Sequence, residues 1–289
     1  MLSVLIPTYQ WNCFPLVESI YQQTSKENIP FEIIVLDDAS GCNDIHLNEK
    51  INSLSHCSFE ILPHNLGRSA IRNLLASRAK YNWLLFLDAD VTPCKGDFIK
   101  NYLLQLKKLN TDIIIGGIKY KASTHKTLRQ SFGEQREAID AEKRNKEPFR
   151  YFFTANFLIK KEIFKSVSFD ENIKEYGYED LLFSIDTKNE SFDIEHINNP
   201  VYHLGIDNDN VFMDKTKQSL ENLKNIIINK ESNFEEIKLV KVVNKFRFFG
   251  NTISQFNSFF EKMALKKQSL FFFDLFKLSY LFKIIKESK

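Results

Sequence analysis

Short apolar runs alternate with helix-like segments along the first half of the chain. The runs "LSVLIPTY", "FEIIVLDD" and "WLLFLDAD" are separated by "FPLVESIYQQT" and "RSAIRNLLASRAK", whose apolar residues have helical spacing. Strands that alternate with helices of this length form a parallel sheet with crossover helices. We therefore expect an α/β fold with a mostly parallel central sheet flanked by helices.

The second half of the chain has a different pattern. "HKTLRQSFGEQREAIDAEKRNKEP" predicts one long polar helix, and "EDLLFSIDTKN" predicts the start of another. "DIIIGGIKY", "DIEHIN" and "PVYHLG" predict further strands, and the chain after Asp207 predicts helices to its end. The α/β part is thus expected to end at about residue 205, where a helical extension follows.

Composition narrows the class of protein. The 289 residues are 43% hydrophobic, which is typical of a globular chain with a sizeable core, and the net charge of +2 favours no class of partner. From its first residues we expect no secretory signal, and we expect no membrane-spanning helix because no segment has roughly 18 consecutive apolar residues. The cysteines form no C-x-x-C pair, so we expect reduced thiols of a cytosolic protein at Cys13, Cys42, Cys57 and Cys94.

Two aspartates follow the apolar run in "WLLFLDADVTP". Asp88 and Asp90 would lie at the carboxyl end of a buried strand, where open α/β sheets bind ligands. One carboxylate can hold a divalent cation and the other a ribose hydroxyl, since Mg²⁺ and Mn²⁺ prefer carboxylate oxygens and bridge diphosphates. The alternatives are an acidic turn without chemistry and a phosphatase motif in which Asp88 is the nucleophile.

The other strand ends carry further candidates. Pro7 is expected to end the first strand, which places Tyr9 at the sheet edge, where its ring could stack on a nucleobase. Asp38 follows the second strand and could accept a hydrogen bond from N3–H of uracil, or could cap a helix.

Gly67 precedes a predicted helix, whose first N–H groups attract phosphate. Arg68 and Arg72 lie four positions apart on one face of that helix, and arginine binds phosphate in a bidentate manner. The alternative is a pair of solvated arginines on a surface helix.

Glu179 and Asp180 open a helix in "EYGYEDLLFS". Acids in a first turn are stabilised by the helix dipole, but Asp180 could also act as a general base towards a hydroxyl. His203 lies on a short predicted strand before Gly205. A lone histidine is usually structural, but beside a D-x-D motif its neutral imidazole suits an ion such as Mn²⁺.

The order of these motifs resembles that of the inverting family 2 glycosyltransferases of the GT-A fold. The resemblance rests on "VLIPTY", "IIVLDDAS", "HNLGRSAIRN", "LLFLDADV", "GYEDLLFS" and "VYHLG", and it covers roughly residues 1 to 205. It implies a GT-A domain over 1–205, with a nucleotide-sugar half (1–110) and an acceptor half (111–205), before the extension 206–289. It also implies transfer of a sugar from a nucleotide-sugar donor, with Mn²⁺ or Mg²⁺, to a glycan or lipid-linked hydroxyl in surface polysaccharide synthesis.

The same resemblance assigns roles to individual residues. Asp180, with Glu179 beside it, matches the catalytic base, and Asp90 and His203 match metal ligands. The family often has Asn after the first-strand Tyr, whereas Gln10 follows here. The donor is expected to be a UDP-sugar because Asp38 suits uracil, with a dTDP-sugar as the alternative because the same contact suits thymine. The expected nucleotide-sugar-binding residues are Pro7, Thr8, Tyr9, Asp38, Gly67, Arg68, Arg72, Asp88 and Ala89. The alternatives are a haloacid-dehalogenase-type phosphatase and a non-catalytic nucleotide-sugar-binding protein.

The end of the chain is basic and aromatic. Between Lys241 and Lys289 there are ten Lys and Arg residues against three acids, a net charge of +7, and twelve aromatics lie between Phe246 and Phe282. This composition suits docking on the cytoplasmic face of a membrane. The charges from Asp274 to Lys286 fall on two arcs of a helical wheel, which instead favours packing on the rest of the chain or a homodimer interface. No nucleic-acid recognition motif accompanies the charge.

Overall fold

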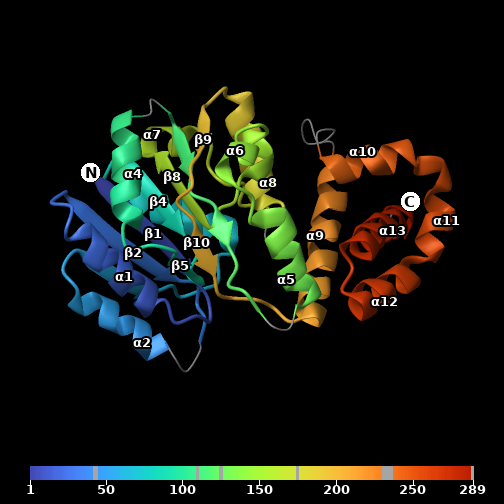
Figure 1. Cartoon of the computed structure of the whole chain (residues 1–289), viewed down its shortest axis with the longest axis horizontal. Helices are drawn as coiled ribbons and strands as arrows, with labels where there is room; N and C mark the ends of the chain where they lie inside the picture. Colours follow the sequence, from blue (N-terminus) through green and yellow to red (C-terminus); the bar gives the residue numbers. More distant parts are fainter. Residues whose placement is uncertain (42–44, 109–110, 124–125, 174–175, 230–236, 288–289) are drawn as a thin grey trace. The chain divides into compact units, whose positions relative to one another are not determined.

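The computed structural model describes residues 1–41, 45–108, 111–123, 126–173, 176–229 and 237–287 (Figure 1). The chain forms two compact units. The first unit comprises residues 1–121, 134–174 and 179–205, and the second comprises 122–133, 175–178 and 206–289. Each unit is described by itself below.

A seven-stranded sheet is the centre of the first unit. Its strands are β1 (Leu2–Thr8), β2 (Phe31–Asp37), β3 (Cys57–Ile61), β4 (Trp83–Leu87), β6 (Ile113–Ile115), β8 (Asn156–Lys160) and β9 (Ile194–His196). Their order is β3-β2-β1-β4-β8-β6-β9, and β8 alone runs antiparallel to its neighbours β4 and β6. The expected α/β class with a mostly parallel sheet is therefore confirmed.

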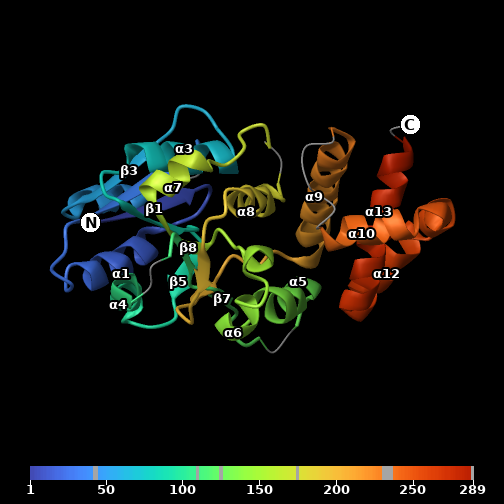
Figure 2. The ribbon, with the colours of Figure 1, turned by 90° about the horizontal axis from the view of Figure 1, so that it is seen from above.

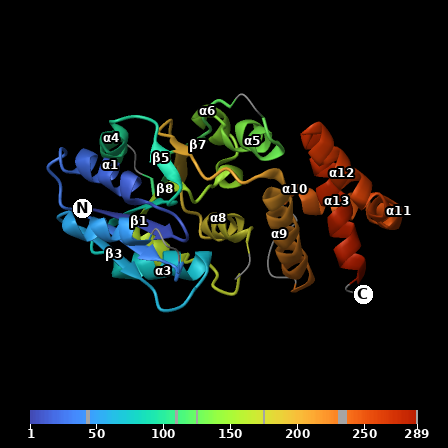
Figure 3. The same cartoon turned by 90° about the horizontal axis from the view of Figure 1, so that it is seen from below.

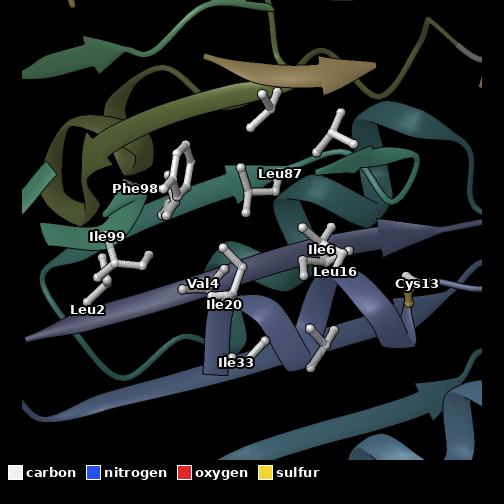
Figure 4. Close-up of a cluster of buried hydrophobic side chains, with 14 of the residues drawn as sticks. Leu2, Val4, Ile6, Cys13, Leu16, Ile20, Ile33, Leu87, Phe98 and Ile99 are labelled. Carbon is white, nitrogen blue, oxygen red and sulfur yellow. The ribbon is translucent and has the colours of Figure 1, made fainter. Parts of the chain in front are cut away.

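Helices cover both faces of this sheet, with α1 and α4 on one side and α3 and α7 on the other (Figure 2). Successive strand residues point to opposite faces, so Val4 and Ile6 pack under α1 (Figure 4). Leu5 instead packs under α3. A sheet buried on both faces requires nearly continuous apolar strands, as the first part of the sequence has. The helices of this unit are α1 (Phe14–Thr24), α2 (Ile45–Glu49), α3 (Arg68–Arg78), α4 (Phe98–Lys108), α6 (Ala141–Arg144), α7 (Lys161–Ser166) and α8 (Glu179–Asn189).

A second, three-stranded sheet lies next to the strand ends. It consists of β5 (Val91–Pro93), β10 (Val201–His203) and β7 (Ile118–Lys119), in the order β5-β10-β7. The run "DIIIGGIKY" was expected to be one strand, but it supplies β6 to the large sheet and β7 to the small one. The chain changes sheets at Gly116 and Gly117, and Gly117 has the positive φ of +92° that glycine adopts without strain.

Arg144 holds this change of sheet in place. Its side chain is buried, and its guanidinium donates to the backbone carbonyls of Ile115, Gly116, Ile139 and Ile197. It also donates to Nδ1 of His196 at 2.8 Å, because arginine has no acceptor. Nε2 of His196 therefore carries the proton and donates to the carbonyl of Pro148 at 2.9 Å. Burial lowers the pKa of His196 to about 4 and the pKa of Arg144 to about 10.

The prediction of one long polar helix in the middle of the chain is wrong. The structure has α5 (Leu128–Phe132), a π-helical turn (Gly133–Glu137), α6 and a 3₁₀ turn (Pro148–Tyr151) in its place. Tertiary contacts interrupt the helix, since the carbonyl of Ile139 accepts from Arg144 and the N–H of Ala141 donates to Asn198. A polar pattern does not reveal that an arginine points inward.

The second unit is helical, as expected after Asp207. Its helices are α5, α9 (Asp209–Asn229), α10 (Lys238–Lys245), α11 (Gly250–Gln255), α12 (Asn257–Lys267) and α13 (Leu270–Glu287). Helices α12 and α13 lie side by side (Figure 3). Their core joins Leu128, Phe212, Met213, Ala264, Phe273 and Phe276.

Two further features concern the expectations from composition. Cys13, Cys57 and Cys94 are free thiols, while Cys42 lies outside the described residues. No helix in the described part of the chain has the length and apolar character needed to cross a membrane.

Acidification is expected to destabilise the fold through His196. The folded chain protonates this side chain near pH 4, whereas its ordinary pKa is 6.5. The unfolded chain therefore binds the proton first, so the stability is present above pH 6.5 and is lost as the pH falls towards 4. The loss is about 3 kcal/mol in the free energy of unfolding. Urea unfolding across this range should show it, with a flatter pH dependence in His196→Asn than in the exposed-histidine control His64→Asn. Equal slopes in the three proteins would contradict the expectation.

Candidate active site

The carboxyl ends of β1, β2 and β4 meet at one edge of the large sheet. Thr8 pairs with Asp37, and the N–H of Asp38 donates to the carbonyl of Thr8 at 2.9 Å. Tyr9 follows with its side chain exposed. Pro7 was expected to end the first strand, but it lies inside β1 and pairs with Leu36. It is tolerated there because the pairing of β1 with β4 stops two residues earlier.

Asp38 ties the end of β2 to the loop before α3. Its buried carboxylate accepts the backbone N–H groups of Leu66 at 2.7 Å and Gly67 at 3.0 Å. Each carboxylate oxygen has a second lone pair, so the group can still accept from a ligand. The neighbouring Asp37 instead closes a local turn through the N–H and hydroxyl of Ser40.

Helix α3 begins at Arg68, and Gly67 before it has a φ of +84°. Arg72 is only 2% exposed, and its Nη2 lies 2.8 Å from Oδ1 of Asp88. The ring of Phe169 lies 5.6 Å from its guanidinium carbon. Arg72 is therefore a buried partner of Asp88. Neither the phosphate-binding interpretation nor that of solvated surface arginines had included this pairing. Arg68 is half-exposed, and its Nη1 lies 3.7 Å from Oε1 of Glu179.

The small sheet brings His203 to the D-x-D segment. Strand β5 starts directly after Asp90 and pairs Val91 with His203 of β10. Nε2 of His203 consequently lies 3.5 Å from Oδ2 of Asp90, and the ring of Tyr120 stacks on the imidazole at 5.7 Å between centroids. Ala89, between the two aspartates, is buried.

Gly205 leaves the space that the carboxylate of Asp90 occupies. A Cβ at position 205 would lie 2.2 Å from Oδ2 of Asp90, and the N–H of Leu204 donates to the backbone carbonyl of Asp90. In the sequence, Gly205 stood out only as the residue that follows the predicted strand with His203. Tyr120 and Gly205 therefore belong to the site, although sequence reasoning gave neither of them a role in it.

Asp90 and His203 fit a shared divalent ion. Their 3.5 Å separation suits two neighbouring ligands of one ion, and carboxylate and imidazole are donors that Mn²⁺ accepts. Within the described ranges, no group of three or more His, Cys, Asp and Glu side chains could hold a metal. A divalent ion here would take its remaining ligands from water or phosphate, as Mg²⁺ usually does.

Glu179 and Asp180 occupy the first turn of α8. Glu179 is buried, and Oδ1 of Asp180 accepts the N–H of Leu181 at 2.8 Å. Burial and the neighbouring charge of Glu179 raise the pKa of Asp180 to about 7. The opposite holds for Asp88, whose pKa stays below its usual range because Arg72 and Arg68 outweigh the effect of burial.

The same two arginines act on both carboxyls. The charges of Arg72 and Arg68 lower the pKa of Asp88. They also act to lower the pKa of Asp180, but burial and the charge of Glu179 outweigh them there. The fold thus brings α3, the D-x-D segment and the start of α8 together. Burial raises the pKa of Asp90, although the charge of His203 opposes it.

Unsatisfied polar atoms gather at the same place. In the part of the chain that the structure describes, four buried side-chain atoms have no hydrogen-bond partner: Ser69 Oγ, Arg72 Nε, Glu179 Oε2 and His203 Nδ1. All four belong to α3, to the first turn of α8 or to the His203 strand. A buried polar atom without a partner is costly, so such a cluster is typical of a site that a ligand completes.

The family profile described as "Glycosyl transferase family 2" matches residues 3–168. The chain belongs to this family. It is therefore a glycosyltransferase, and the phosphatase alternative is not supported. The ion pair of Asp88 with Arg72 agrees, since a carboxylate held by a buried arginine is a poor nucleophile.

Relatives of known sequence include polysaccharide synthases. The chain is 27% identical over 217 residues to a chondroitin synthase of Pasteurella multocida and 26% identical over 216 residues to a hyaluronan synthase of the same species. Each match covers 63% of this chain but 22% of the synthase, so the chain spans about a fifth of the length of these relatives.

Solved structures of S. aureus TarS share the fold. Residues 1–349 of TarS in complex with UDP-GlcNAc align with 100% of this chain and 92% of that chain, at a TM-score of 0.51 and 16% identity. The same TarS fragment without that ligand gives a TM-score of 0.50 at 17% identity. These matches confirm the GT-A fold that the motif order implied.

Substitution of Gly205 should disturb the metal site without unfolding the chain. In Gly205→Ala the new Cβ would force the carboxylate of Asp90 away from His203. The Mn²⁺ affinity is expected to fall about 10- to 100-fold, as for other groups that orient metal ligands. Isothermal titration with Mn²⁺ measures this loss. Gly96→Ala is the matched control, because a Cβ there meets nothing within 4 Å. Unchanged Mn²⁺ binding in Gly205→Ala would contradict the site.

Proposed function

We propose that this family 2 glycosyltransferase moves one sugar from a UDP-sugar to a hydroxyl group, with inversion at the anomeric carbon and with the help of a divalent ion. The observation that supports it most is the contrast between two carboxyls under the same arginines. Asp88 is held ionised, whereas the pKa of Asp180 is raised to about 7. A general base is most effective when its pKa lies near the working pH.

Asp180 is the proposed base. It would take the proton of the acceptor hydroxyl while the hydroxyl oxygen forms a bond to the anomeric carbon and the bond from that carbon to the diphosphate breaks. Glu179 keeps one carboxylate oxygen near Arg68 and leaves the other without a partner. The charge of Glu179 also raises the pKa of the neighbouring Asp180. Glu179 would therefore both tune the proposed base and shape the site.

The donor would lie along the sheet edge. Tyr9 would stack on the base, Asp38 would accept from N3–H, Asp88 would accept from the ribose, and the exposed Arg68 would approach the diphosphate. A divalent ion on Asp90 and His203 would neutralise charge that develops on the departing diphosphate. The structure of TarS with UDP-GlcNAc supports a uridine nucleotide, although Asp38 would accept from thymine equally well.

The acceptor is proposed to be a glycan or a lipid-linked sugar in surface polysaccharide synthesis. The chondroitin and hyaluronan synthases among the relatives support this class. Residues 1–110 would serve the donor and 111–205 the acceptor. We place the reaction in the cytoplasm, at the inner face of the plasma membrane.

Asp180→Asn tests the base. Asparagine keeps the shape of the side chain but cannot take a proton, so turnover should fall about 10²- to 10⁴-fold while UDP binding and the thermal midpoint stay the same. In the unchanged protein, kcat/KM should rise with pH through about 7, since only the deprotonated Asp180 is active. The matched control is Asp186→Asn on the same helix, which should retain turnover. Near-normal turnover of Asp180→Asn would remove this residue from the role of base.

A panel of nucleotides tests the donor. Isothermal titration with UDP, dTDP, GDP and CDP, each with and without Mn²⁺, should show binding of UDP, or equally of dTDP, that weakens when Mn²⁺ is omitted. Asp38→Asn should weaken UDP binding, because an amide has one acceptor oxygen and cannot serve the N–H groups of Leu66 and Gly67 and also N3–H of uracil as the carboxylate would. Tightest binding of GDP, or UDP binding that is equal with and without Mn²⁺, would refute the assignment.

A further inference from the structure

One turn of the second unit exposes three phenylalanines. Phe246, Phe248 and Phe249 lie at the 3₁₀ turn between α10 and α11, and they are 39%, 84% and 62% exposed. Phe273 and Phe276 of the same unit are almost fully buried in its core, whereas Phe256, Phe259 and Phe271 are exposed outside this turn. We call the three exposed rings of the turn, together with Lys245 and Arg247, the Phe248 surface.

The chain is buried on both sides of this turn, so the exposure of the three rings is a feature of the fold. Val240 and Val243 on α10 are buried before it, and Gly250 is buried directly after it. A Cβ at Gly250 would lie 2.6 Å from the ring of Phe282, which shows how closely the backbone packs on α13. The chain is held on both sides of the turn while the rings between point to solvent.

The described residues 237–260 around the turn carry charge of one sign, while Glu235 and Glu236 directly before them lie outside the described residues. From residue 237 to residue 260 there are four basic residues and no acidic residue: Lys238, Lys241, Lys245 and Arg247. The ammonium of Lys245 lies 5.7 Å from the ring centroid of Phe246, and the guanidinium of Arg247 lies 5.0 Å from that of Phe248. Two acids of the following helices are already paired, Glu261 with Lys217 and Asp274 with Lys277.

We propose that the Phe248 surface docks on a bilayer that contains anionic lipid. Its rings would enter the boundary between headgroups and acyl chains while its cations contact the headgroups, a combination that peripheral proteins use. A second copy fits less well, because a two-fold interface on this surface would bring Lys245 and Arg247 of both copies together. The proposal deepens the membrane location given above and depends on neither the donor nor the base.

Vesicle binding by the full chain tests the proposal. The chain should sediment with vesicles of phosphatidylcholine and phosphatidylglycerol but not with vesicles of phosphatidylcholine alone, and less so at high salt. Phe248→Ser with Phe249→Ser should lower the partition coefficient about tenfold or more. Lys245→Gln with Arg247→Gln should lower it about 30-fold.

Helix α4 of the first unit offers matched controls. Leu104→Ser removes an exposed apolar side chain, and Lys107→Gln with Lys108→Gln removes two exposed cations. Both variants should bind vesicles as the unchanged chain does. The thermal midpoint of every variant checks that the fold is intact, and UDP titration checks the donor site of the first unit. A chain that binds these vesicles but not UDP would overturn the donor assignment and leave this proposal standing.

Several results would overturn the docking proposal. They are absent or equal binding to both kinds of vesicle, and vesicle binding that the Phe248 surface variants do not reduce. A dimer in sedimentation velocity that becomes monomeric in Phe248→Ser with Phe249→Ser would show an interface between copies instead. Binding to single-stranded DNA that the variants abolish, without vesicle binding, would show a nucleic-acid surface.

Discussion

The ion pair between the buried Arg72 and the partly exposed Asp88 is the constraint on which the site depends. It joins the first turns of α3 to the end of β4 at 2.8 Å. Removing Asp88 would leave the charge of the buried Arg72 uncompensated, which is far more costly than the pair itself. Because the pair keeps Asp88 ionised, Asp88 can only accept hydrogen bonds, whereas Asp180 nearby remains able to exchange a proton near neutral pH.

Features set by local pattern could be predicted from the sequence. The apolar runs identified the strands, and their ends located Asp88, Asp90 and Asp38. The partners of these residues could not be predicted, because they depend on register between distant segments. Nothing local indicates that Arg72 turns inward onto Asp88, or that Tyr120 stacks on His203.

The failures follow from the same limit. The segment with Arg144 has a polar helical pattern, yet one buried guanidinium that serves four carbonyls divides it into short pieces. The aromatic tail likewise has no single periodicity, because some of its rings form a core and others face solvent. The two arcs of charge on its last helix are consistent with a helix that packs on one side, and Phe273 and Phe276 are buried there.

The pairing of β5 with β10 has a consequence for how the enzyme is made. Val91 and His203 are neighbours in the small sheet, although more than a third of the chain lies between them. Contacts between such distant positions close late in folding, because a long loop must be ordered first. Most of the sheet would therefore leave the ribosome before Asp90 could contact the imidazole of His203. Unfinished chains would thus present Asp90 without His203 until the last strand is added.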